Sequence, residues 1–220
     1  MKSFLVLKFP KNKIMYPSFC KNLGPFSLEQ LSSKINILST NVKNDYPLNE
    51  FLGITHPKEN TLTFINDNED IKNIEFSKSV LLCSKKKLNQ LEKNHLYIAV
   101  DNLHYSVAKV SNLFYRNYLN SEIIDMAKPK IGTNCLIAND AVIENGTIIG
   151  DNVIINGGAR IKNNCIIGDR CQIGSNSVIS NSIFAEDIEI GRNCSIGQSG
   201  FGFSISSTKN VKIFHIGRVV

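Results

Sequence analysis

The 220-residue chain has no tryptophan, three methionines and six prolines, and no apolar run long enough to cross a membrane. Its apolar N-terminal stretch, residues 4–9, contains Lys8 and is too short for the core of a secretory signal. We therefore expect a cytoplasmic protein. No two cysteines have the CxxC spacing of a zinc site, and no cofactor motif is present, so the sequence predicts neither a metal nor a cofactor.

Basic residues outnumber acidic ones by 25 to 19, which gives a net charge of +6. This excess suits an anionic partner such as a nucleotide phosphate, an acidic carrier protein, nucleic acid or a membrane surface. A simpler interpretation is a composition with many solvated lysines. The basic run at residues 85–87 is short and has no interleaved aromatic residues, so it does not support nucleic-acid binding.

Isoleucines recur every six residues through the second half of the chain. Helical faces recur every 3.6 residues and strand faces every two, so a six-residue apolar period predicts coils that stack on one another. Small or medium side chains occupy a second inward position, four residues after an isoleucine. The isoleucines are Ile131, Ile137, Ile143, Ile149, Ile155, Ile161, Ile167, Ile173 and Ile179, and the smaller residues are Cys135, Ala141, Thr147, Val153, Ala159, Cys165, Cys171 and Ser177.

Glycine, asparagine and aspartate gather at the expected corners between these segments. Glycine directly after an isoleucine suits a tight corner where a Cβ would cost conformational energy, and Asn and Asp tolerate turn backbone. The corner residues include Gly132, Asn134, Asn139, Gly150, Asp151, Asn152, Asn163, Asn164, Gly168, Asp169, Gly174 and Asn176. Each buried isoleucine is expected to contribute about 1.5–3 kcal/mol. The sequence predicts a β-solenoid whose core is distributed along a column.

The cysteines fit this column better than a disulfide framework. Four of the six fall at the small inward position, and we expect a reducing compartment, so the prediction is free, buried thiols. These four are Cys135, Cys165, Cys171 and Cys194.

Residues 15–124 lack the six-residue period and predict a separate mixed α/β module. Ser27 with Gln30 three residues later is the pattern of a capping box that opens a short helix. Asp101 or Asn102 is expected to cap a second helix that ends near Asn120. Strands are expected at residues 61–65, 79–83 and 96–100, and a linker at 125–129.

The solenoid is expected to span residues 130–220 with one interruption. After Ile179 the period slips by one residue, so Phe184 takes the next inward position before the period resumes at Ile190 and Ile196. Residues 200–212 break the repeat and predict a loop extruded from the column. Residues 212–220 resemble a resumed coil with no cap after it, so we expect a C-terminally incomplete solenoid.

Four segments together resemble UDP-3-O-acylglucosamine N-acyltransferase of lipid A biosynthesis: LGPFSL at 23–28, TLTFI at 61–65, IGQSGFGF at 196–203 and KIFHIGRVV at 212–220. The resemblance implies a left-handed parallel β-helix that forms a homotrimer, preceded by a small uridine-binding domain. It also implies transfer of a 3-hydroxyacyl chain from acyl carrier protein to the 2-amino group of a UDP-3-O-acylglucosamine, a UDP-sugar substrate.

The same resemblance implies substrate-binding residues in the module. Phe64 matches the phenylalanine that stacks on uracil, and its alternative is a core phenylalanine on a strand. The family's asparagine and tyrosine positions hold Asp67 and Asp70 here. A one-residue shift would bring Asn68 into the asparagine role, but it would supply no second aromatic ring.

The extruded loop carries a second set of expected binding residues. Gly200, Phe201, Gly202 and Phe203 match the family's loop, whose aromatic rings would line a substrate or acyl groove. Ser199 stands where the family has aspartate. The alternative is a loop that packs its phenylalanines against the column or across a trimer interface.

No catalytic residue is assigned. The sugar ammonium must lose a proton before it attacks, and the family's histidine for this step lies on a later coil that the match does not reach. His56, His95 and His104 are interpreted as surface or locally bonded histidines. His215, near the loop, is interpreted as a coil or interface residue.

Three functional hypotheses follow. The chain is the N-acyltransferase or an N-terminal piece of it, a different sugar-nucleotide acyltransferase of the hexapeptide class, or a catalytically silent β-helix that only folds and trimerises. Because the resemblance begins near Ser18, residues 1–14 are expected to be an extension and Met15 an alternative initiator.

Overall fold

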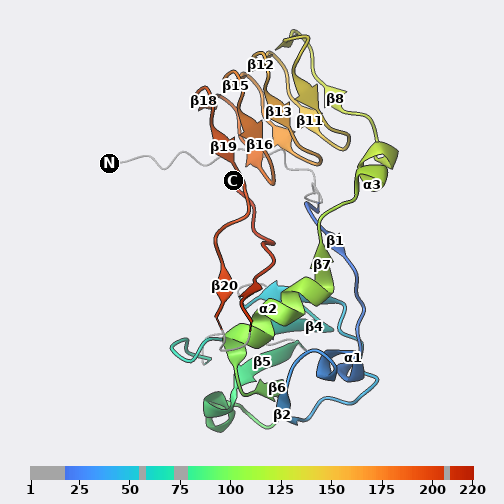
Figure 1. Cartoon of the computed structure of the whole chain (residues 1–220), viewed down its shortest axis with the longest axis vertical. Coiled ribbons are helices and arrows are strands. Elements are labelled where there is room, and N and C mark those ends of the chain that lie inside the picture. Colours follow the sequence, from blue (N-terminus) through green and yellow to red (C-terminus); the bar gives the residue numbers. More distant parts are fainter. Residues whose placement is uncertain (1–17, 55–57, 72–78, 206–208) are drawn as a thin grey trace. The chain divides into compact units, whose positions relative to one another are not determined.

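The computed structural model describes residues 18–54, 58–71, 79–205 and 209–220 (Figure 1). They form two compact units, which are described separately. An α/β module comprises residues 22–116 and 201–215, and a β-helix comprises residues 18–21, 117–200 and 216–220. The expected bounds were 15–124 for the module and 130–220 for the β-helix, and the largest difference, at residues 201–215, arises because this segment packs on α2 of the module. The expected extension 1–14, Met15 and His56 lie outside the described residues.

The module is built on a five-stranded sheet with the order β2-β6-β5-β4-β3. Strands β3 to β6 are parallel to their neighbours, and β2 runs antiparallel to β6 at the edge. Three of the strands confirm the expectations for residues 61–65, 79–83 and 96–100. The bounds are β2 Ile37–Thr40, β3 Glu50–Gly53, β4 Thr61–Phe64, β5 Val80–Ser84 and β6 Leu96–Val100.

Both faces of this sheet are covered, as expected for parallel strands that read as continuous apolar runs. On one face, helix α2 (Leu103–Phe114) packs its Phe114 ring 6.3 Å from the ring of Phe51 on β3. On the other face lies a cluster of buried side chains, against which residues of the 3₁₀ helix η1 (Lys85–Gln90) pack. That cluster consists of Ile65, Ile71, Leu81, Cys83 and Ala99.

Both expected helix caps are present. In front of α1 (Leu28–Ser32), the Ser27 hydroxyl accepts from the Gln30 N–H at 3.3 Å, and the Gln30 side chain accepts from the Ser27 N–H at 2.8 Å. The Asn102 side chain accepts from the Tyr105 N–H at 3.0 Å and begins α2. Both interactions satisfy helix N–H groups that have no partner within the helix.

Helix α2 ends at Phe114, earlier than expected. Tyr115 is extended and belongs to β7 (Tyr115–Arg116), which pairs with β1 (Lys21–Asn22). The Tyr115 hydroxyl donates to the Phe51 carbonyl at 2.8 Å and accepts from its N–H at 3.2 Å, which favours the extended conformation over another helical turn. A separate short helix, α3 (Asn120–Asp125), follows.

Strands β20 (Phe203–Ser204) and β21 (Val211–Lys212) form an antiparallel hairpin that packs on α2 (Figure 1). Two α2 side chains hold it. Asn112 Nδ2 donates to the Lys212 carbonyl at 2.6 Å, and the Ser111 hydroxyl accepts from the Phe214 N–H at 3.0 Å. The segment expected as a loop on the column is therefore an element of the module.

The β-helix consists of short strands in three parallel sheets, ordered β8-β11-β14-β17, β9-β12-β15-β18 and β10-β13-β16-β19 (Figure 1). Each strand pairs with the strand one coil later, so that Ile131, Ile149 and Ile167 stack in register. The bounds are β8 Lys130–Ile131, β9 Leu136–Ile137, β10 Val142–Ile143, β11 Ile148–Ile149, β12 Ile154–Ile155, β13 Arg160–Ile161, β14 Ile166–Ile167, β15 Gln172–Ile173, β16 Val178–Ile179, β17 Ile183–Phe184, β18 Glu189–Ile190 and β19 Ser195–Ile196.

The inward ladder is confirmed by burial and register. Ile149 and the ladder isoleucines from Ile155 to Ile179 are buried, whereas Ile131 on the first coil is 50% exposed because it has a neighbouring coil on one side only. The slip is confirmed as well, since Phe184 pairs with Ile167 and Ile190 pairs with Ile173. None of the six cysteines forms a disulfide, as expected, and Cys83, Cys165 and Cys171 are buried. Cys135 and Cys194, also expected to be buried, are only half-buried because they lie near the two ends of the column.

The corners use two different devices. Asparagines occupy left-handed backbone, as expected, with φ between 55° and 61° at Asn134, Asn152, Asn164 and Asn176. Of the glycines after isoleucines, Gly132, Gly150, Gly168 and Gly174 do not have positive φ, whereas Gly197 has a φ of 72°. A Cβ on Gly174 would lie 2.4 Å from the Gly191 carbonyl oxygen of the next coil. Close approach of successive coils, rather than backbone freedom, therefore explains the glycines without positive φ.

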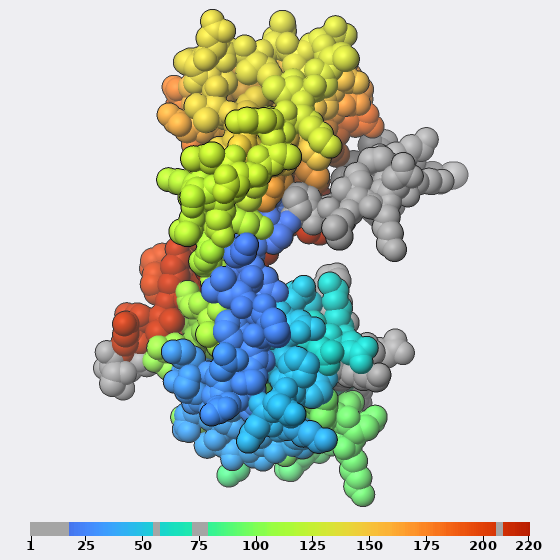
Figure 2. All heavy atoms as spheres, turned by 90° about the vertical axis from the view of Figure 1, so that its right-hand side faces the viewer, coloured from blue at the N-terminus to red at the C-terminus, as the bar shows by residue number. Residues whose placement is uncertain are grey.

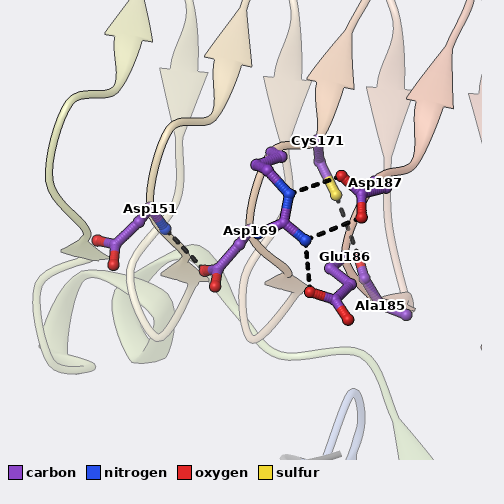
Figure 3. Close-up of polar contacts among 7 residues, drawn as sticks. Asp151, Asp169, Cys171, Ala185, Glu186 and Asp187 are labelled. Atoms are coloured by element: carbon purple, nitrogen blue, oxygen red, sulfur yellow. Dashed lines mark hydrogen bonds and ion pairs between the residues drawn. The ribbon is translucent and has the colours of Figure 1, made fainter. Parts of the chain in front are cut away.

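Aspartates at one corner form a ladder along the column (Figure 3). The Asp151 carboxylate accepts from the Thr133 N–H at 2.6 Å. The Asp169 carboxylate accepts from the Asp151 N–H at 2.9 Å, and this second bond is the one drawn in Figure 3. The hydrogen bond from the Thr133 backbone lowers the pKa of Asp151, because it stabilises the charged form. Expected simply as turn residues, these aspartates also connect one coil to the next.

Arg170 adds an ion-pair contact at the same corner (Figure 3). It has a left-handed φ of 57°, and its guanidinium donates to Asp187 through Nε at 2.7 Å and to Glu186 at 2.5 Å. The hydrogen bonds from Arg170 lower the pKa of Asp187. The three side chains are about half exposed, so the contribution to stability is small.

The β-helix resumes after the hairpin, as expected. Val219 bridges Ser182 in parallel: its N–H donates to the Asn181 carbonyl, and its carbonyl accepts from the Ile183 N–H, both at 2.9 Å. The resumed segment is shorter than the expected 212–220, since Lys212 belongs to β21.

Candidate functional site

An open pocket of about 870 Å³ lies where β4, β5 and β6 end. These three neighbouring strands are parallel, so the segments that follow them meet at one edge of the sheet. Ligands of open α/β sheets bind outside the carboxyl ends of the strands. We call this cavity the carboxyl-edge pocket. Its lining residues are Leu38, Asn66, Asp67, Asn68, Ser84, Lys85, Lys86, Val100, Asp101, Asn102, Leu103 and His104.

A turn after β4 presents Asp67 and Asn68. The Asn66 N–H donates to the Glu69 carboxylate at 2.7 Å, and the Glu69 N–H donates to the Asn66 carbonyl at 3.1 Å, which closes the turn. Asp67 accepts from the Ser84 hydroxyl at 2.5 Å and lies 3.9 Å from the Lys86 ammonium. Its side chain is therefore oriented while 49% of it stays exposed.

The loop after β6 presents a second carboxylate. Asp101 accepts from the Asn102 N–H at 2.7 Å and from the Asn36 side chain at 3.1 Å. The pocket thus contains two aspartates and the two exposed lysines Lys85 and Lys86, so its formal charges balance. Such a mixture of acceptors and cations suits a polar ligand that has both hydroxyl and anionic groups.

A second pocket of about 620 Å³ lies on the other side of the same turn and also contacts Asp67 and Asn68. Lys87 is buried there, and its ammonium donates to the Glu69 carbonyl at 2.5 Å and to Gln90 at 3.1 Å. Under the turn, burial followed by the nearby Asp67 charge raises the pKa of the Cys83 thiol to about 11. Cys83 is therefore an unreactive core thiol.

The structure separates the expected substrate-binding residues of the module. Asp67 and Asn68 lie together in the carboxyl-edge pocket, whereas Asp70 lines only the second pocket. Phe64 lines neither described pocket. It ends β4 half-buried, with its ring 5.6 Å from that of Phe51. The strand and the aromatic packing match the alternative of a core phenylalanine, and the uracil-stacking role stays a prediction.

The expected loop residues lie on or next to the hairpin, outside both pockets. Phe201 is 95% exposed and Phe203 is 39% exposed, with ring centroids 4.9 Å apart. Gly202 lies close to Ile213: a Cβ added to Gly202 would be 3.8 Å from the Ile213 Cβ. The two rings pack on each other and line neither of the two pockets described above. The substrate-binding roles of Gly200, Phe201, Gly202 and Phe203 stay predictions.

Several pocket residues were not among the expected ones: Ser84, Lys85, Lys86, Asp101 and His104. Each follows shortly after the end of a strand that the sequence does predict. The missing information was the order and direction of the strands, because only neighbouring parallel strands bring such segments to one edge.

The described histidines supply no assigned base. His95 is locally bonded, as expected, since its Nδ1 accepts from the Glu92 N–H at 3.2 Å. His104 lines the carboxyl-edge pocket, and His215 is exposed. Residues 117–200 contain no histidine. Within the described ranges, no three His, Cys, Asp or Glu side chains are grouped to hold a metal ion.

The coils are those of a left-handed β-helix of the hexapeptide type, a fold found in sugar-nucleotide transferases. Residues 127–215 match the family model described as the GMPPB C-terminal domain, which supplies the handedness. This match covers less than half of the chain and does not single out the lipid A enzyme. No curated protein matches the chain. None of the helices in the described ranges is long and apolar enough to cross a membrane.

Proposed function

We propose that the chain binds a sugar nucleotide in the carboxyl-edge pocket and takes part in acyl transfer to its sugar, as the N-acyltransferases of lipid A biosynthesis do. The observation that carries the proposal is a charge-balanced pocket at the ends of three parallel strands, in a chain whose β-helix is of the kind found in sugar-nucleotide transferases. The resemblance to UDP-3-O-acylglucosamine N-acyltransferase adds the acyl transfer.

Different residues of the pocket are proposed to bind different parts of the sugar nucleotide. Asp67 and Asp101 are oriented acceptors for ribose or sugar hydroxyls. Lys85 and Lys86 are cations for the diphosphate. The Asn68 side chain, which forms no hydrogen bond with any described residue, is available to the edge of a base.

In the proposed reaction, the 2-amino nitrogen attacks the thioester of a 3-hydroxyacyl chain on acyl carrier protein. The C–N bond forms, the C–S bond breaks, and the proton lost by the nitrogen passes to the departing thiolate of the carrier protein. The net charge of +6 favours both the acidic carrier and the nucleotide diphosphate. No residue of this chain is assigned as the base. We further propose a homotrimer in the cytoplasm.

A different sugar-nucleotide acyltransferase of the hexapeptide class is the second candidate. Three departures from the lipid A pattern favour it: Asp67 and Asp70 replace the asparagine and tyrosine, and Ser199 replaces the loop aspartate. A non-catalytic β-helix is the third candidate, favoured by the lack of histidine in residues 117–200.

Isothermal titration of the full chain with UDP-N-acetylglucosamine and with a guanosine diphosphate sugar tests the binding step. Asp67→Ala and Asp101→Ala are each expected to weaken binding at least about tenfold, since a hydrogen bond to a charged group contributes about 1.5–3 kcal/mol. Asp45→Ala, at an exposed aspartate outside the pocket, is the matched control and is expected to bind like the wild type.

Assays of acyl transfer separate the three candidate functions. Transfer from acyl carrier protein to UDP-3-O-acylglucosamine identifies the lipid A activity, and transfer only to another sugar nucleotide identifies the second candidate. Binding without transfer identifies the silent one. Failure of both sugar nucleotides to bind refutes the proposal. Light scattering tests the trimer, whose mass would be three times 24.5 kDa.

A further inference from the structure

The hairpin presents three apolar side chains on one face. Side chains alternate across a strand, and Phe203 pairs with Lys212 while Ser204 pairs with Val211. Phe201, Phe203 and Ile205 stand at alternate positions and are 95%, 39% and 80% exposed, whereas Ser204 between them is 2% exposed. We call these three residues the apolar ridge. Figure 2 shows the hairpin region in red at the surface, beside green residues that include α2.

The ridge is held in this outward position. The opposite face of the hairpin packs on α2, where Asn112 donates to the Lys212 carbonyl and Ser111 accepts from the Phe214 N–H. The Phe214 ring also stacks on Tyr115 at 6.2 Å. Lys212 and Phe214 are bonded to the helix through their backbone groups, and β20 pairs with β21. The hairpin therefore cannot turn over to bury the ridge without breaking these contacts.

The segment that carries the ridge is basic. Residues 201–215 contain Lys209 and Lys212 and no acidic residue. Lys212 is exposed and lies directly across the hairpin from Phe203, on the same face as the ridge. The apolar side chains are thus combined with positive charge in a segment that has no acidic residues.

The exposure and the small size of the ridge indicate which kind of partner it binds. An acyl groove would enclose the rings, but Phe201 is almost fully exposed. A stable protein interface uses about 20–30 residues on each side, far more than this ridge offers. A bilayer interface, by contrast, receives a few protruding apolar side chains next to lysines and needs no complementary surface. We propose that the apolar ridge and Lys212 form a docking surface for an anionic lipid bilayer.

This inference stands apart from the proposed function, because no ridge residue lines the carboxyl-edge pocket. Failure of sugar-nucleotide binding would leave it intact, and failure of lipid binding would leave the pocket intact. The two experiments therefore report on separate surfaces.

The absence of tryptophan from the chain allows a direct test. Phe201→Trp places one reporter on the ridge, and Leu136→Trp, at an outward β-helix position that is 68% exposed, is the control. Vesicles of phosphatidylcholine with or without phosphatidylglycerol are added to each full-length variant. With anionic vesicles, the Phe201→Trp emission is expected to shift to the blue and to be quenched by brominated acyl chains. The Leu136→Trp emission is expected to change in neither way.

Vesicle sedimentation measures the contribution of each side chain. The double variant Phe201→Ser/Ile205→Ser is expected to lower the partition coefficient at least about tenfold, because two apolar side chains leave the lipid. Lys212→Gln is expected to lower it about fivefold on anionic vesicles and not at all on neutral ones. Leu136→Ser and Lys93→Gln, both exposed, are matched controls expected to bind like the wild type.

Several results would overturn the proposal. Wild-type chain that stays in solution with anionic vesicles would do so, as would ridge variants that bind like the wild type. A lower mass of the double variant by light scattering would assign the ridge to a contact between copies. Loss of acyl carrier protein binding with unchanged lipid binding would assign it to an acidic protein. If the double variant does not fold, the Phe201→Trp emission still decides.

Discussion

Replacing Gly174 by alanine is expected to destabilise the β-helix strongly. The added Cβ would lie 2.4 Å from the Gly191 carbonyl oxygen, 2.5 Å from its carbonyl carbon and 2.7 Å from the Arg192 nitrogen. All three atoms are backbone of the next coil, so no side-chain rotation relieves the contact. The coils would have to separate at this corner, where the Gly174 N–H donates to the Ile190 carbonyl at 2.8 Å.

The size of the effect follows from two contributions. Overpacking a close contact costs about 1–3 kcal/mol. Weakening one interstrand hydrogen bond adds about 0.5–1.5 kcal/mol. The expected loss is therefore about 2–4 kcal/mol, which in a chain of this length lowers the melting temperature by roughly 4–16 °C.

The same corner offers a matched control one coil later. At Gly191 the nearest atom to an added Cβ is the Cys194 sulfur at 3.6 Å, an ordinary contact. Gly191→Ala is expected to melt near the wild-type temperature or slightly above it, because alanine restricts the unfolded chain. Thermal unfolding followed by circular dichroism measures both variants. Equal melting temperatures for Gly174→Ala and Gly191→Ala would refute the close-approach explanation of the corner glycines.

Two further predictions concern buried groups. Burial raises the pKa values of the Cys83 and Cys165 thiols to about 11 from 9.0, so the stability they contribute below pH 9 is lost as the pH rises towards 11. The melting temperature is expected to fall less steeply over this range in Cys83→Ala than in the wild type, and parallel slopes would contradict the pKa assignment. Tyr115→Phe removes the hydroxyl that bonds both backbone groups of Phe51 and is expected to cost about 1–3 kcal/mol in urea unfolding, whereas an unchanged midpoint would show that water replaces it.

The β-helix was largely predictable because its coils repeat one local rule. An isoleucine every six residues fixes which side chains face inward, and even the slip to Phe184 can be read from the spacing. The reason for the corner glycines could not be predicted from this spacing. It depends on how closely the Gly191 carbonyl approaches Gly174 from the next coil.

The module was less predictable because its elements depend on distant partners. The short strands at 37–40 and 50–53 have weak patterns and are defined by pairing in the sheet. The hairpin depends on Ser111 and Asn112 of α2, which are far from it in the sequence. Only part of the carboxyl-edge pocket was predicted from the sequence. Asp67 and Asn68 were expected, but the residues next to them at this edge follow from the order of the strands in the sheet.

The insertion of residues 201–215 into the module has a consequence for synthesis on the ribosome. The α2 surface that receives the hairpin is complete at Phe114, but its partner is made roughly 100 residues later, which takes about 5–20 s at 5–20 residues per second. Throughout this interval the nascent chain carries an uncovered α2 surface while the coils are still being made. The module can reach its final packing only after most of the β-helix has been translated.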